Sequence, residues 1–209
     1  MIEYNEIKKR IHFLKRDLLN KVRYGNSAPR FGQIIYVDPR KCNSYLVSEW
    51  NRKHSGDVQS GDWDISVRPL EEHPKYQYCV QHWVHGVSWR DAGAYDFLKG
   101  LIEARGEAVD GCFTEQDILD RYDELDRVFE YVSRTRQLSP RKEINPDNFR
   151  ETGGIYFHIN RSGIPIFGGG GVHRFSMSKI LNFTCVPAQL GVVHADAVKD
   201  WQKLKNLPE

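Results

Sequence analysis

The residues best suited to chemistry in this 209-residue chain lie in one stretch, Phe167 to Arg174, where four consecutive glycines precede a histidine and an arginine. Glycine lets backbone N–H groups approach a ligand closely. The run Phe175 to Leu181 predicts a helix, and the N–H groups at the start of a helix attract anions. We interpret the stretch as a phosphate cradle, the alternative being a tight turn with a surface cation. The predicted phosphate-binding residues are Gly168, Gly169, Gly170, Gly171, His173 and Arg174.

The segments around the glycines predict the elements that position them. Apolar runs predict strands at Ile155 to Ile159, at Ile164 to Phe167 and at Val186 to Leu190. A turn at Asn160 to Gly163 separates the first two. The glycines therefore lie between a strand and a helix, which is where proteins usually bind phosphate.

This part of the chain resembles the ParB/sulfiredoxin-like superfamily. Gly170-Gly171-x-His173-Arg174, followed by a helix, Leu181-Asn182-Phe183 and Val186 to Leu190, is similar to its box G-G/D-G-x-H-R … L-G … I-P-x-x-V. Ile34 to Pro39 is similar to its opening strand, I-x-V-x-P. The resemblance covers roughly a third of the chain, and the His-Arg box is its specific part.

The resemblance implies an α+β fold with a small mixed sheet of the ParB/sulfiredoxin type. We expect a single domain over residues 1–209, divided into an N-terminal amphipathic helix (1–30), a first strand (31–40), a mainly helical insertion (41–150) and the Gly-x-His-Arg core (151–195). The superfamily includes ATP-using sulfiredoxins, small-molecule and serine kinases, and CTP-hydrolysing DNA clamps. It therefore implies a nucleotide, ATP or another nucleoside triphosphate, with its phosphates against the glycines.

Two positions depart from the superfamily pattern. Sulfiredoxins carry their catalytic cysteine where this chain has Val172, which argues against reduction of sulfinic acids. Several kinase-like relatives carry aspartate where this chain has Gly170, so a carboxylate for phosphoryl transfer must come from another segment. A binding module that retains the cradle without catalysis also fits this pattern.

Ser60-Gly61-Asp62-Trp63-Asp64 is the segment that offers such carboxylates. Asp62 and Asp64 are candidates to hold Mg²⁺ or to act as general base toward a hydroxyl, while Trp63 offers a stacking surface. The alternative is an Asx-type turn that Trp63 anchors in the core.

The predicted function is that of a kinase-like phosphotransferase acting on a small-molecule or saccharide hydroxyl. Arg174 would neutralise charge on the transferred group, and His173 would donate a hydrogen bond to a phosphate oxygen. Asp62 or Asp64 would bind Mg²⁺ or orient the acceptor. The alternatives are a ParB-like, nucleotide-dependent DNA-binding protein and a nuclease.

Composition narrows the partners. A formal net charge of +2 is too small to argue for nucleic acid, which we do not favour as a partner. The chain lacks an apolar run long enough to span a membrane, so we expect a soluble, cytoplasmic protein. Near the N-terminus, Ile7, Ile11, Leu14, Leu18 and Val22 recur at helical spacing among basic residues. Such a helix usually packs by its apolar side and leaves its charges in water, a role at nucleic acid or an anionic surface being the alternative.

A second amphipathic helix is predicted in the middle of the chain. Thr114 is a candidate N-cap, with Glu115 and Asp117 in the first helical turn. The later acidic residues, among them Asp126, are expected on its solvated face.

Overall fold

The protein is a mixed α+β structure, described by a computed structural model over residues 4–47 and 50–207. These residues form one seven-stranded mixed sheet and six helices. Contacts divide the chain into two compact units. Unit 1 comprises Met1–Leu70, Ser139–Gly171 and Thr184–Glu209, and unit 2 comprises Glu71–Leu138 and Val172–Phe183. The whole sheet belongs to unit 1.

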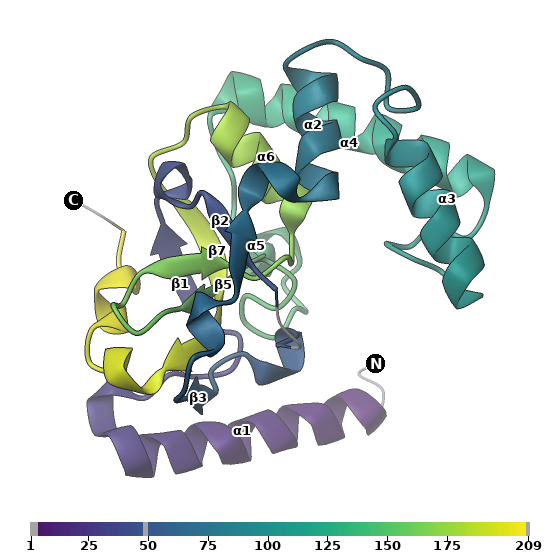
Figure 1. Ribbon diagram of the computed structural model, residues 1–209. Helices are drawn as coiled ribbons and strands as arrows, with labels where there is room; N and C mark the ends of the chain where they lie inside the picture. Colours follow the sequence, from purple (N-terminus) through teal and green to yellow (C-terminus); the bar gives the residue numbers. More distant parts are fainter. Residues whose placement is uncertain (1–3, 48–49, 208–209) are drawn as a thin grey trace. The chain divides into compact units, whose positions relative to one another are not determined.

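The longest strand of unit 1 is β7 (Val186–His194), which pairs with three other strands. It runs antiparallel to β1 (Ile34–Val37) and parallel to both β5 (Ile155–Ile159) and β3 (Val58–Gln59). Every residue of β5 and β7 is buried. Continuous apolar runs of this kind are typical of strands covered on both faces. Figure 1 shows β5 and β7 side by side in the sheet.

The remaining strands extend the sheet beyond β5. β6 (Pro165–Phe167) pairs antiparallel with β5, β2 (Ser44–Leu46) pairs parallel with β6, and β4 (Val67–Pro69) pairs antiparallel with β2. The strands predicted near residues 34, 155, 164 and 186 are confirmed. Residues 41–70 differ from the mainly helical prediction, because they form β2, β3, β4 and short 3-10 turns that pair with strands distant in sequence.

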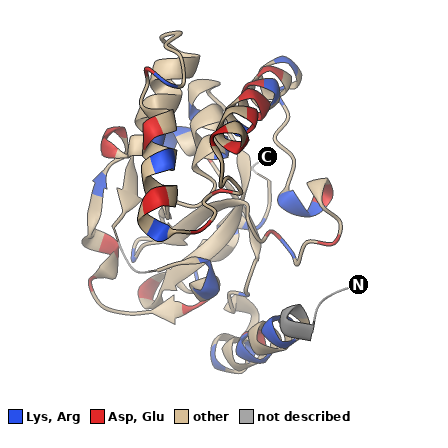
Figure 2. Cartoon of the chain, turned by 90° about the vertical axis from the view of Figure 1, so that its right-hand side faces the viewer, with Lys and Arg blue, Asp and Glu red and all other residues tan. Residues whose placement is uncertain are grey.

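The predicted N-terminal helix is α1 (Tyr4–Tyr24), residues 1–3 lying outside the described part of the chain. It packs on the rest of unit 1 through Phe13, whose ring centroid lies 3.5 Å from that of Phe31. The polar residues Asp17 and Asn20 make further contacts. Its apolar stripe is exposed, with Leu18 at 64% and Val22 at 80%. The expectation that the apolar side packs is therefore wrong. Figure 2 shows the Lys and Arg residues that recur along α1.

Unit 2 is helical. It contains α2 (Pro74–Trp83), α3 (Ala94–Arg105), α4 (Glu115–Thr135) and α6 (Val172–Ile180), whereas α5 (Arg141–Ile144) belongs to unit 1. Its core contains Tyr78, Leu98, Ile118 and Tyr122. None of the helices in the described residues is long and apolar enough to cross a lipid bilayer.

The predicted cap of α4 is confirmed. The Thr114 hydroxyl accepts from the Asp117 N–H at 3.2 Å, and the Asp117 carboxylate accepts from the Thr114 N–H at 2.8 Å. Asp126 differs in part from the prediction of a solvated position: its side chain is 35% exposed, but its carboxylate accepts from the indole N–H groups of Trp83 and Trp89 at 2.9 and 3.0 Å. Its Oδ1 also lies 3.0 Å from Nε2 of His82. Asp126 thus ties α4 to the aromatic core of unit 2.

Candidate functional site

The four-glycine loop, Gly168–Gly171, joins β6 to α6 and has backbone conformations that favour glycine. Gly169 and Gly171 have φ of +77° and +72°, in the left-handed region. Gly169 is exposed, and a Cβ added to it would meet nothing within 4 Å. The loop therefore has an open side at Gly169.

The other side of the loop packs closely against His158 and Arg52 of the same unit. A Cβ at Gly168 would lie 2.6 Å from Nε2 of His158, and one at Gly170 would lie 2.6 Å from Nη2 of Arg52. The Gly168 N–H donates to the Tyr156 carbonyl at 2.7 Å, and the Tyr156 N–H donates to the Gly170 carbonyl at 2.9 Å. Within the described part of unit 1, the N–H groups of Gly169, Gly170 and Gly171 donate to no other residue. Three consecutive backbone donors thus remain for a ligand.

Arg52 supplies positive charge at this loop. Its Nη1 donates to Oε1 of Gln189 at 2.6 Å and its Nη2 to the Gly154 carbonyl at 2.7 Å. Both acceptors are neutral, and among the described residues no carboxylate lies within ion-pair distance of Arg52. Burial, which disfavours the charged form, lowers its pKa from the usual value. Arg52 is thus a cation beside Gly170 that hydrogen-bonds neutral groups only, although the charge of the buried Glu151 carboxylate favours its protonated form.

A local motif places Arg52. It begins a short 3-10 turn, Arg52–His54, in which the Asn51 side chain accepts from the Lys53 N–H and the His54 ring accepts from the Asn51 N–H. The Asn51 carbonyl accepts from the Tyr156 hydroxyl at 2.9 Å, which fastens the turn to β5. Arg52 is not among the residues predicted from the sequence, where its only signal is the basic run Arg52-Lys53-His54.

Tyr156 and His158 lie on the same face of β5, because alternate residues of a strand share a face. Nδ1 of His158 accepts from the Val192 N–H at 3.1 Å, so the proton of the neutral ring is on Nε2. Nε2 is buried and has no hydrogen-bond partner among the described residues. Burial lowers the pKa of His158 to about 3, which keeps the ring neutral. A neutral donor therefore faces Gly168.

A cavity of about 290 Å³ in unit 1 is also lined by Arg52. Its lining combines cations and phenyl rings and includes no carboxylate; the residues are Lys9, Arg10, Phe13, Phe31, Arg52, Lys53, Phe149 and Thr152. Such a lining suits an anion with a flat or apolar body.

The Gly-Asp-Trp-Asp segment reaches the same imidazole from another side. The Trp63 ring lies 5.8 Å from that of His158, edge to face, and its Nε1 donates to the Gln59 carbonyl. Asp62 and Asp64 both bind Arg161 of the β5–β6 turn, with Nη2 of Arg161 at 2.8 and 2.6 Å. These hydrogen bonds lower the pKa of the buried Asp64 to about 2.

The ion pair between Asp64 and Arg161 argues against the predicted Mg²⁺ site at Asp62 and Asp64. Asp64 already has a cationic partner, so Mg²⁺ would have to displace Arg161 to reach it. The side chain of Asp62 is 75% exposed and has one oxygen on Arg161. The described residues contain no group of three or more metal-ligating side chains. Asp64 therefore fits an anchoring role better than a metal site.

His173 and Arg174 lie in unit 2, since α6 begins at Val172 rather than at the predicted Phe175. Nε2 of the buried His173 is 3.1 Å from the Tyr78 hydroxyl, and the two rings stack. Burial lowers the pKa of His173 to about 3. Arg174 is half-buried. His173 thus has a packing role in unit 2.

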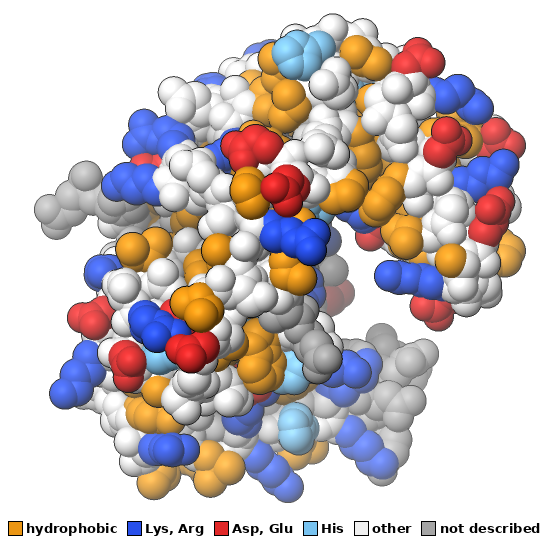
Figure 3. Space-filling view, viewed as in Figure 1, with side chains coloured by type: hydrophobic (Ala, Val, Ile, Leu, Met, Phe, Trp, Pro, Cys, Tyr) orange, Lys and Arg blue, Asp and Glu red, His pale blue; other side chains and the backbone are white. Residues whose placement is uncertain are grey.

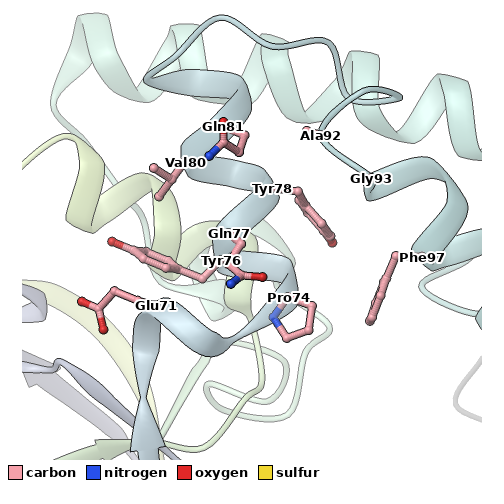
Figure 4. A pocket seen from close by; sticks show the side chains of 10 residues that line it. All are labelled: Glu71, Pro74, Tyr76, Gln77, Tyr78, Val80, Gln81, Ala92, Gly93 and Phe97. Atoms are coloured by element: carbon pink, nitrogen blue, oxygen red, sulfur yellow. The ribbon is translucent and has the colours of Figure 1, made fainter.

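Unit 2 has a cavity of its own, of about 420 Å³. Figure 4 shows Tyr78 and Phe97 on either side of an open space, with Pro74 below them. Its lining includes Glu71 and no lysine or arginine, which makes it unsuited to phosphate.

Comparison with known proteins identifies no relative. The chain matches no protein-family model, no curated protein and no solved structure. Function must therefore be argued from the site.

Proposed function

We propose that the protein binds a nucleoside triphosphate, with its phosphates against Gly168–Gly171, and transfers a phosphoryl group to a hydroxyl of a small molecule or saccharide. The observation that carries this proposal is Arg52, whose guanidinium adjoins Gly170 with only neutral acceptors. Among the residues that the structure describes, no carboxylate forms an ion pair with this partly buried guanidinium, and Glu151 acts on it only through its nearby charge. A bound phosphate would place negative charge directly against Arg52 and accept strong hydrogen bonds.

The glycine loop and the residues beneath it also support a nucleoside triphosphate as the ligand. The N–H groups of Gly169, Gly170 and Gly171 would donate to phosphate oxygens, and Arg52 would stabilise charge that develops during transfer. The cationic, phenyl-lined cavity next to Arg52 has room for part of a nucleotide. The residues present thus fit ATP or a related triphosphate.

The residues fit Mg²⁺ less well, because Arg161 engages Asp64. We therefore assign Asp64 no step in the reaction. Asp62, exposed and bound to Arg161 through one oxygen, is the remaining candidate to orient an acceptor hydroxyl. Roles for His173 and Arg174 in phosphate binding stay predictions.

Concave geometry favours a nucleotide over the DNA-binding alternative. Lys9, Arg10, Arg52 and Lys53 line a cavity, whereas contact with duplex DNA requires cations spread over an open face. The nuclease alternative has no specific observation in its favour.

The test is thermal stabilisation by ATP, CTP, GTP and ADP, each with and without Mg²⁺. A ligand that binds only the native state raises the melting temperature. We expect at least one nucleotide to do so, and Arg52→Gln to abolish the effect. Arg68→Gln, which removes an exposed arginine of β4, is the matched control. Product analysis with the stabilising nucleotide and candidate hydroxyl acceptors then tests transfer.

A second variant, Gly169→Ala, tests the same site in case Arg52→Gln does not fold. Gly169→Ala adds a methyl group in open space but strains a backbone at φ +77°, by about 1 kcal/mol. It should weaken nucleotide binding while the protein remains folded. No shift in melting temperature with any nucleotide would refute the proposal.

A further inference from the structure

The exposed side of α1 carries an apolar stripe. Six aliphatic side chains are between 46% and 80% exposed: Ile7, Ile11, Leu14, Leu18, Leu19 and Val22. Steps of three and four residues place most of them on one side of the helix. A contiguous aliphatic surface of this kind is typical of an interaction site.

The opposite side of α1 fixes the helix to unit 1 by polar contacts. Asp17, 7% exposed, accepts from the Phe31 N–H at 2.8 Å and pairs with Arg150 at 2.6 Å. Arg16 pairs with Asp57 at 2.6 Å, and Asn20 donates to the Gly56 carbonyl at 2.8 Å. These contacts hold the stripe outward, so it is not required for packing within unit 1.

Cations border the stripe. Lys8, Lys15, Lys21 and Arg23 are exposed, and the only carboxylate between Ile7 and Tyr24 is that of Asp17, on the packed side. In Figure 3, blue and orange side chains intermingle along the lower edge, where Figure 1 shows α1. The exposed side of the helix is therefore aliphatic and positively charged.

We infer that α1 lies along the surface of an anionic lipid bilayer, with its aliphatic stripe among the acyl chains and its lysines at the lipid phosphates. An amphipathic helix with Lys and Arg beside its apolar sector binds such surfaces in this orientation. Each cation near an anionic leaflet strengthens binding. This inference does not rest on the proposed nucleotide site, to which α1 contributes other residues, Lys9, Arg10 and Phe13.

Two features favour a bilayer over a protein partner. Pairing of two copies through the stripe would bring the lysines of both copies together, which is unfavourable. A coiled coil with another helix needs heptads sustained over three or four repeats, whereas here the spacing Ile7, Ile11, Leu14, Leu18 leads next to Lys21. Leu19 and Val22 extend the apolar side beyond a coiled-coil seam, and helical periodicity places Lys8 and Lys15 between them.

The test is flotation of the full chain with vesicles of phosphatidylcholine alone and of phosphatidylcholine with phosphatidylglycerol. We expect binding to the anionic vesicles that weakens with salt. Ile11→Ser/Leu18→Ser should lower the partition constant about tenfold or more, since two aliphatic side chains no longer insert. Lys8→Gln/Lys15→Gln should also lower it.

Leu119→Ser, which changes an exposed leucine of α4, is the matched control and should bind like the wild type. Because all these positions are exposed, we expect the variants to fold, and circular dichroism checks this. The inference is overturned if the wild type does not float with anionic vesicles. It is also overturned if Ile11→Ser/Leu18→Ser binds these vesicles as strongly as the wild type. Self-association in sedimentation velocity that this variant abolishes, without flotation, would instead assign the stripe to a second copy.

Discussion

Oδ1 of Asp64 accepts a hydrogen bond from Nη2 of Arg161 at 2.6 Å, and Oδ2 accepts from Nε at 3.0 Å. The Arg161 N–H donates to Oδ2 as well, at 2.9 Å. One buried carboxylate thus joins the segment around Trp63 to the turn between β5 and β6.

Asp64→Asn should therefore destabilise the protein by about 2 kcal/mol, because a buried neutral amide cannot replace the charged acceptor of three Arg161 donors, N, Nε and Nη2. Asp62→Asn should change stability by less than about 0.5 kcal/mol, since that side chain is 75% exposed. Urea unfolding at pH 7 measures both. Equal effects of the two substitutions would contradict the anchoring role.

Acid should remove the contribution of Asp64. Its pKa is about 2 in the folded protein against an ordinary value of 3.8, so the ion pair stabilises the protein above pH 4. This contribution is lost as the pH falls from about 4 toward 2, where the unfolded and then the folded carboxyl group becomes protonated. The stability difference between wild type and Asp64→Asn should narrow over that range. A difference that stays constant from pH 7 to pH 2 would count against the shift.

The inverted packing of α1 predicts an unusual pair of results. Asp17→Asn should destabilise by about 2 to 3 kcal/mol, because it weakens the contacts to Phe31 and Arg150. Leu18→Ser, the adjacent substitution, should change stability by less than about 0.5 kcal/mol. Chemical unfolding distinguishes them, and the reverse order would mean that α1 packs by its apolar side.

Asp126 should be the carboxylate of α4 most important for unit 2. Asp126→Ala leaves the indole N–H groups of Trp83 and Trp89 without an acceptor, at a cost of about 1 to 3 kcal/mol. Asp123→Ala, on the exposed side of the same helix, should cost far less. Thermal unfolding followed by tryptophan fluorescence compares the two variants. An unchanged emission spectrum and melting temperature for Asp126→Ala would refute the assignment.

The sequence predicted those parts of the fold that local patterns specify. Continuous apolar runs predicted β5 and β7, and the Thr114 capping signal predicted the start of α4. Residues 41–70 were not predicted, because their strands are two or three residues long and depend on pairing: β2 pairs with β4 and β6, and β3 pairs with β7. The strand preference of a short segment does not indicate which distant strand it will pair with.

The candidate site was predicted in part for a similar reason. The glycines and Trp63 stand out by composition, and unit 1 brings both to His158. Arg52 comes within reach of Gly170 only through the turn that Asn51 caps, and no spacing in the sequence indicates that contact. The sequence also did not predict that the apolar stripe of α1 faces outward. Specific polar contacts of Asp17 and Asn20 outweigh the usual preference for apolar packing.

The position of β7 has a consequence for biosynthesis. β1, β3 and β5 all pair with this strand, yet its residues, 186–194, are translated after all of them. A nascent chain therefore exposes the unpaired edges of β1 and β5 until residues 186–194 have left the ribosome. Strands in this condition are prone to aggregate. We expect unit 1 to fold late and to depend on chaperones more than its size alone would suggest.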